Sequence, residues 1–158
     1  MAETSPQDHY AGAARRHHDD AVYLHDDGRL PNADHHYGFA VECALKSLLL
    51  RYLGATLQPK TPGGKPQVKP WVPGSNGKPQ FFEHLPHVWS DVAMLLHGRS
   101  GSALGSLLQS SQPFASWDVG ERYLDGEAVD AAEVTARRAA AHKILLLHQQ
   151  ALTAGVLS

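Results

Sequence analysis

The stretch YGFAVECALKSLLL, residues 37–50, decides the fold class of this chain. Its only charged residues are Glu42 and Lys46, which lie one helical turn apart in the order that favours an ion pair. Apolar residues flank this pair on both sides, so no broad polar face remains. We therefore expect a helix at the centre of a helical bundle. A carboxylate buried there needs a partner, and the candidates are Lys46, Arg122 and the Tyr123 hydroxyl.

Length, charge and cysteine content narrow the classes of protein that the chain can represent. A chain of 158 residues suits one core, so residues 1–158 are treated as a single domain. A net charge of −2 gives no general affinity for nucleic acid, which requires clustered Lys and Arg. One cysteine cannot form an intrachain disulfide. The polar N-terminus and the lack of a long apolar run favour a cytoplasmic protein with no membrane segment.

Apolar residues at helical spacing predict four main helices and one short helix. The first is expected to begin at Ser5-Pro6 and to end at Asp27-Gly28, and the second to run from an Asn32 cap to Gly54. The later helices are expected at 83–97, at 104–108 (the short one) and from 126 or 127 to 152. No strand pattern competes with these helices. The sequence therefore predicts an all-α, up-and-down bundle.

Residues 55–82, between the second and third helices, are expected to form a flexible loop insertion. Six of the ten prolines and four glycines fall within residues 59–80, and this density prevents a helix. The same stretch holds four lysines and no acidic residue. It can be a solvated insertion or a basic arm that contacts a phosphate or a partner. We expect Trp71 to dock on the chain, because an exposed indole is unfavourable.

Three segments form a pattern by their order along the chain. They are GFAVECALKSLL at residues 38–49, His84-Leu85, and WDVGERY at residues 117–123. The first resembles the A-x-E-x-x-L-K-x-L helix of the HEPN superfamily, named for higher eukaryote and prokaryote nucleotide binding. The second resembles the H-x-L start of that family's third helix, and the third resembles the W-x-x-x-x-R-Y turn before its last helix.

The resemblance implies a helical bundle that forms a homodimer and acts on RNA or nucleotides in toxin–antitoxin or antiphage systems. Many members are metal-independent endoribonucleases, whereas others lack the catalytic pair and bind a nucleotidyltransferase partner. An antitoxin is a further partner that such a system implies. In the matched motifs the binding or structural polar candidates are Glu42, Lys46, Asp118 and Tyr123.

Active members of the family carry an Arg followed by a His after four to six residues, at the junction into the last helix. The pattern occurs three times in this chain, in the pairs Arg29–His35, Arg29–His36 and Arg137–His142. Chance alone predicts about two such matches for this composition, so the count is not informative. Arg122 occupies the junction, but no histidine follows it at the required spacing. This departure favours a degenerate catalytic motif.

Arg138 and His142 provide an alternative pair, because residues four apart share one face of a helix. Arg137 and His142 lie roughly 140° apart around the same axis. An arginine can stabilise charge on a phosphate, and a histidine can act as an acid or a base near neutral pH. The catalytic candidates are therefore Arg122, Arg138 and His142, with Arg137 as the weaker one.

Three functions remain open at this point. The chain can be an RNA-, nucleotide- or partner-binding module, an active endoribonuclease toxin, or a purely structural helical adaptor. Histidine pairs with metal-like spacing occur at His17-His18, at His35-His36 and at His84 with His87. His84 and His87 flank Pro86, and no carboxylate lies at a conventional offset from them to complete a chelate. No metal and no other cofactor is predicted.

Overall fold

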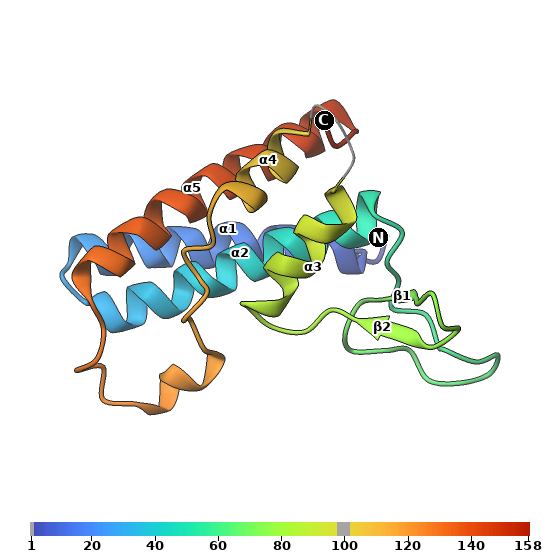
Figure 1. Ribbon diagram of the computed structural model, residues 1–158, viewed down its shortest axis with the longest axis horizontal. Coiled ribbons are helices and arrows are strands. Elements are labelled where there is room, and N and C mark those ends of the chain that lie inside the picture. Colours follow the sequence, from blue (N-terminus) through green and yellow to red (C-terminus); the bar gives the residue numbers. More distant parts are fainter. Residues whose placement is uncertain (1, 98–101) are drawn as a thin grey trace.

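The computed structural model describes residues 2–97 and 102–158, and it confirms the all-α class (Figure 1). Three helices are long: α1 (Pro6–Asp26), α2 (Leu30–Tyr52) and α5 (Ala131–Ala154). The others are shorter: α3 (His87–Leu96), α4 (Ala103–Ser110) and a 3₁₀ helix, η1 (Val119–Tyr123). The third and fourth helices are 10 and 8 residues long, which makes them shorter than the three long helices.

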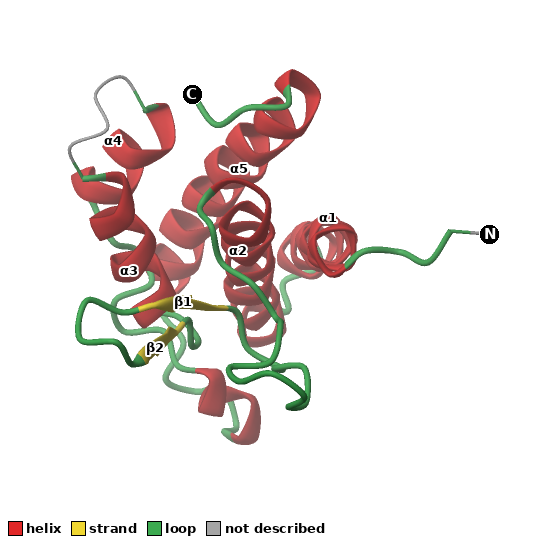
Figure 2. Cartoon of the chain, turned by 90° about the vertical axis from the view of Figure 1, so that its right-hand side faces the viewer, coloured by secondary structure: helices red, strands yellow, loops and turns green. Residues whose placement is uncertain are grey.

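Helix α2 is the centre of the fold, as its apolar sequence predicts. It packs against α1, α5, α3 and η1, and Figure 2 shows it between α1 on one side and α3 on the other. The short turn at residues 27–29 brings α1 and α2 side by side in opposite directions (Figure 1). The residues of α2 that are completely buried include Tyr37, Val41, Ala44, Leu45, Leu48 and Leu49.

The N-terminus of α2 lies three residues earlier than its predicted start. Asn32 is not the cap; the helix begins at Leu30, and Arg29 precedes it without a side-chain capping bond. Pro31 explains the difference, because its fixed φ suits the first helical turn and its missing N–H needs no partner there.

Two other helices begin later than predicted, each for a local reason. Helix α3 begins at His87 and not at Glu83, because a residue before proline, here Leu85, is disfavoured in the helical conformation. Helix α5 begins at Ala131 and not at Gly126-Glu127. Asp130 caps it by accepting a hydrogen bond from the Ala132 N–H at 2.7 Å.

The loop between α2 and α3 contains a small sheet, so the prediction that no strand occurs is wrong. Strands β1 (Trp71–Pro73) and β2 (Pro79–Phe81) pair antiparallel, with Trp71 opposite Phe81. Trp71 docks as expected, since its indole N–H donates to the Gln58 carbonyl at 2.9 Å. Phe82, which follows β2, is completely buried and ties the hairpin to the core.

Residues 113–117 are anchored to α2, as their aromatic content suggests. Phe114 and Trp117 are buried, and the Trp117 indole N–H donates to the Asp34 carbonyl at 3.2 Å. The same indole lies directly on Gly38, where an added Cβ would meet Trp117 Cε2 at 2.1 Å. Glycine is therefore required at position 38 by the close approach of a rigid ring.

Polar residues also occur inside the helical core. His148 of α5 hydrogen-bonds with Ser47 of α2 at 3.0 Å, and both side chains are buried. Burial lowers the pKa of His148 to about 4, so the imidazole is neutral at neutral pH. None of the described helices is both long enough and apolar enough to cross a membrane.

We expect Gly38→Ala to destabilise the protein by about 1–3 kcal/mol, because the new methyl group overlaps the buried Trp117 ring. Gly12→Ala is the matched control. Gly12 also lies inside a long helix, but nothing lies within 4 Å of its added Cβ. The control should gain about 0.5–1 kcal/mol from the better helix propensity of alanine. Urea unfolding measures both changes, and equal effects of the two substitutions would contradict the contact.

Candidate functional site

An open groove of about 820 Å³ runs between α1 and α5 and holds two of the predicted catalytic residues. Arg138 and His142 lie on the same face of α5, as their spacing predicts, and both line this groove. Two further residues of the lining, His18 and Asp26, come from α1. The complete lining is His18, Asp19, Val22, Tyr23, Asp26, Thr135, Arg138, Ala139 and His142.

Arg138 is held in the groove by a carboxylate from α1. Its Nη1 donates to Asp26 Oδ1 at 2.7 Å, and the two side chains are 35% and 62% exposed. The hydrogen bond lowers the pKa of Asp26 and raises the pKa of Arg138. Exposed pairs of this kind contribute little to stability, so an anionic ligand can replace Asp26 at small cost.

Two imidazoles face each other across the groove. The ring centroids of His18 and His142 are 6.1 Å apart. Burial lowers the pKa of His18, and its Nε2 is buried without a hydrogen-bond partner among the described residues. His18 is therefore neutral near pH 7, whereas His142 is exposed to solvent. Together with Arg138 they supply a cation and two proton-transfer groups.

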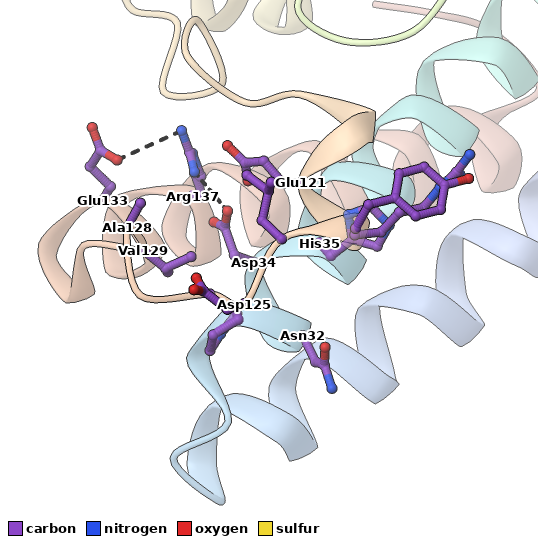
Figure 3. Close-up of a pocket in the computed structure, with 14 residues that line it drawn as sticks. Asn32, Asp34, His35, Glu121, Asp125, Ala128, Val129, Glu133 and Arg137 are labelled. Atoms are coloured by element: carbon purple, nitrogen blue, oxygen red, sulfur yellow. Dashed lines mark hydrogen bonds and ion pairs between the residues drawn. The ribbon is translucent and has the colours of Figure 1, made fainter.

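Arg137, the weaker catalytic candidate, lies inside the fold and not in the groove. Its Nη1 donates to Asp34 Oδ2 at 2.7 Å, and the side chains of this pair are 4% and 1% exposed. Its Nε donates to the Pro113 carbonyl at 3.0 Å, and its Nη2 donates to Ser116 Oγ at 2.9 Å. Figure 3 shows its contacts with Asp34 and Glu133. Arg137 therefore joins α5 to α2 and to the segment before η1.

Arg122, one of the three candidate partners of Glu42, does not pair with that carboxylate, whose partners are Lys46 and His84. The side chain of Arg122 is exposed, and the guanidinium lies over the neighbouring Tyr123 ring at 4.8 Å from the ring centre. Tyr123 is itself 78% exposed. Asp118 caps η1 by accepting from the Gly120 N–H at 2.6 Å. Arg122 is thus separate from Arg138 and His142, because Arg122 lines a different cavity.

Glu42 and Lys46 are buried in the middle of α2, where they organise the start of α3. Lys46 Nζ lies 3.8 Å from Glu42 Oε2, which confirms Lys46 as a partner. Neither Arg122 nor Tyr123 contacts Glu42. Instead Glu42 Oε1 hydrogen-bonds with His84 Nδ1 at 2.9 Å and accepts from the Leu85 N–H at 3.2 Å. Glu42 therefore joins α2 to the residues before α3, and Lys46 provides a positive charge beside it.

The remaining histidines form contacts but no recognisable chelate. His17 Nδ1 lies 3.0 Å from His36 Nδ1, and burial lowers the pKa of His17 to about 4. His35 stacks on Trp117 with ring centroids 5.6 Å apart. Within the described ranges, no three His, Cys, Asp or Glu side chains lie close enough together to hold a metal ion.

The sequence patterns did not predict that residues of α1 line the groove. His18, Val22 and Asp26 recur every four residues and so share one face of α1, which is the available signal. That spacing predicts a common face, but it does not reveal that α5 packs beside it.

Comparison with protein-family models, with curated proteins and with solved structures gave no match for this chain. Its function must therefore be inferred from the chemistry of the residues described above.

The contrast between the two arginines can be tested by unfolding experiments. Asp34→Ala should cost about 3–5 kcal/mol, because it leaves the Arg137 guanidinium buried without its carboxylate. Arg122→Ala should change the free energy of unfolding by less than about 0.5 kcal/mol, because Arg122 is exposed. The double variant Asp34→Leu with Arg137→Met should lose less than the two single variants combined. A large loss for Arg122→Ala would refute this assignment.

Proposed function

We propose that the chain is a HEPN-type helical domain that binds RNA or a nucleotide in the groove between α1 and α5. Contacts between the matched motifs support this proposal. Glu42 of the first motif bonds to His84 of the second, and Trp117 of the third packs on α2 at Gly38. In this proposal the helices form an up-and-down bundle. Two copies form a homodimer in the cytoplasm, with a nucleotidyltransferase or an antitoxin as partner in toxin–antitoxin or antiphage systems.

The observation that carries the proposal is the convergence of Arg138, His142 and Tyr23 on one open groove. Tyr23 is 73% exposed, so its ring is accessible to a ligand in the groove. An exposed aromatic ring can stack on a base, and a guanidinium can bind a phosphate. The groove thus combines the two contacts that binding of a nucleotide requires.

The charges in the groove also set the strength of binding that we expect. Asp19 and Asp26 oppose an anionic ligand, so Arg138 must exchange its contact with Asp26 for a phosphate. Breaking the exposed contact between Arg138 and Asp26 costs little free energy, but the new contact between Arg138 and a phosphate gains equally little. Binding should therefore be modest and should weaken as salt screens the single phosphate contact.

Arg138→Ala should weaken the binding of a fluorescein-labelled single-stranded RNA by about threefold to fivefold, equivalent to about 0.7–1 kcal/mol. It should also reduce the slope of log Kd against log salt by about one, because one phosphate contact is lost. Fluorescence anisotropy at several salt concentrations measures both quantities. Tyr23→Leu, which removes the stacking ring, should weaken binding without changing the salt slope.

Lys143→Ala is the matched control for Arg138→Ala. Lys143 lies on the same helix, is exposed and does not line the groove, so the two variants lose the same formal charge. Equal weakening by both variants would mean that only net charge matters and would exclude the groove. Wild-type protein that fails to bind RNA and mononucleotides would exclude the binding proposal altogether.

A second candidate function is RNA cleavage in the same groove, favoured by the His18–His142 pair beside Arg138. Cleavage by the RNA 2′-hydroxyl requires a base, an acid and a cation near the phosphate. The two imidazoles are the candidates for the acid and the base. His142 is exposed to solvent, whereas His18 Nε2 is buried and has no described hydrogen-bond partner.

If the groove cuts RNA, cleavage will persist in EDTA, and His142→Ala will lower its rate by about 10²–10⁴-fold. His18→Asn should cause a similar loss, whereas Lys143→Ala should not. Gel analysis of total RNA and transfer RNA after incubation measures the rates. Cleavage that none of the groove variants reduces would point to a contaminating nuclease and would reject this second function.

A further inference from the structure

A second cavity, of about 380 Å³, lies at the end of the bundle where α2 begins (Figure 3). Its walls come from the first turns of α2, from η1 with the loop that follows, and from the first turns of α5. It shares no lining residue with the groove between α1 and α5. Its volume is within the range that small organic ligands occupy.

The loop after η1 forms one wall of this cavity and is closely fitted to α2. Gly126 adopts a left-handed φ of +84°, and a Cβ added there would meet Pro31 Cγ at 2.6 Å. Glycine is therefore required to let the loop approach the start of α2. Apolar side chains of this wall, including Leu124 and Val129, can cover a short aliphatic stem.

Carboxylates outnumber available cations in the lining. Asp34, Glu121, Asp125 and Glu133 face the cavity together with Arg122 and Arg137, which gives a formal charge of −2 from four acids and two arginines. Arg137 is already engaged by Asp34, Pro113 and Ser116, so its guanidinium has little capacity left for a ligand. The surplus of acceptors favours a cationic donor over an anion.

One of these acceptors lacks a partner although it is buried. Asp34 is 1% exposed; its Oδ2 accepts from Arg137, but its Oδ1 has no hydrogen-bond partner among the described residues. A buried acceptor without a donor is unfavourable, because it has lost its hydrogen bonds to water. His35 Nδ1, in the same wall, is also buried without a partner in the described part of the chain.

Glu121 supplies a second acceptor beside Asp34. Burial raises the pKa of both carboxyl groups, and the negative charge of Asp34 raises the pKa of Glu121 further. Figure 3 shows the side chains of Glu121, Asp34 and Arg137 reaching the cavity from three separate segments. Two carboxylates that repel each other are both stabilised by one cation with several N–H donors.

We propose that this cavity binds a small organic cation, an alkyl guanidinium or alkyl ammonium, whose N–H groups bond to Glu121 and Asp34. The aliphatic stem lies against Leu124 and Val129. Because the cavity and the groove are lined by different residues, amine binding does not depend on RNA binding. Arg138→Ala should therefore leave it unchanged.

Isothermal titration with agmatine and with putrescine tests the proposal on the intact chain at about 0.15 M salt. We expect saturable binding with a Kd below about 1 mM. Glu121→Gln should weaken this binding at least tenfold, because it removes the charge but keeps the size of the side chain. Glu127→Gln is the matched control, since Glu127 is exposed in the same loop but does not line the cavity.

Three outcomes would overturn the proposal: no saturable heat with either amine, equal affinities for Glu121→Gln and Glu127→Gln, or preferential binding of guanosine over both amines. Preferential binding of guanosine would mean that the cavity recognises the edge of a neutral base and not a cation. Thermal unfolding without ligand confirms that both variants are folded. The carboxylates of Glu121 and Glu127 form no hydrogen bond with the described residues. The backbone N–H of Glu127 donates to Asp125 Oδ1, and the substitution keeps this bond, so both variants should fold.

Discussion

The ion pair between Arg137 and Asp34 is the contact on which the arrangement of the chain depends. It is almost completely buried, and its arginine also holds the carbonyl of Pro113 and the hydroxyl of Ser116. Desolvation offsets most of the attraction in such a pair, so its net contribution to stability is small. Its effect is to make one arrangement of the helices more favourable than the alternatives. A shift of α5 along α2 would leave two charges buried and unpaired, and that is far more costly than the pair is favourable.

The two adjacent arginines of α5 therefore have different roles. Consecutive residues of a helix point about 100° apart, so Arg137 faces α2 while Arg138 faces α1 and solvent. Fixing Arg137 fixes the rotation of α5, and this rotation places Arg138 and His142 opposite His18. The same contact places Asp34 in the wall of the cavity at the end of the bundle. One buried pair thus sets the geometry of both proposed sites.

Local patterns in the sequence correctly predicted the helical class, the central position of α2 and the burial of Glu42. They did not predict the partners of the buried charges, because His84 is 42 residues from Glu42 and Asp34 is 103 residues from Arg137.

Two further patterns in the sequence of α5 indicate the burial of Arg137 and the start of the helix. Arg137 lies in a stripe with Val134, Ala141, Ile144 and His148 at spacings of three or four residues, which is the core face of α5. Asp130 followed three residues later by Glu133 is a helix-start signature that marks the true beginning of α5.

The contact between Gly38 and Trp117 has a consequence for how this chain can change in evolution. A larger residue at position 38 is compatible with the fold only if position 117 becomes smaller, and a smaller ring would uncover the Asp34 carbonyl that it now caps. Positions 38 and 117 are therefore coupled by this contact, and positions 34 and 137 form a second coupled pair through their buried ion pair. Positions 138 and 142 line the open groove, so substitutions there leave both buried pairs unchanged.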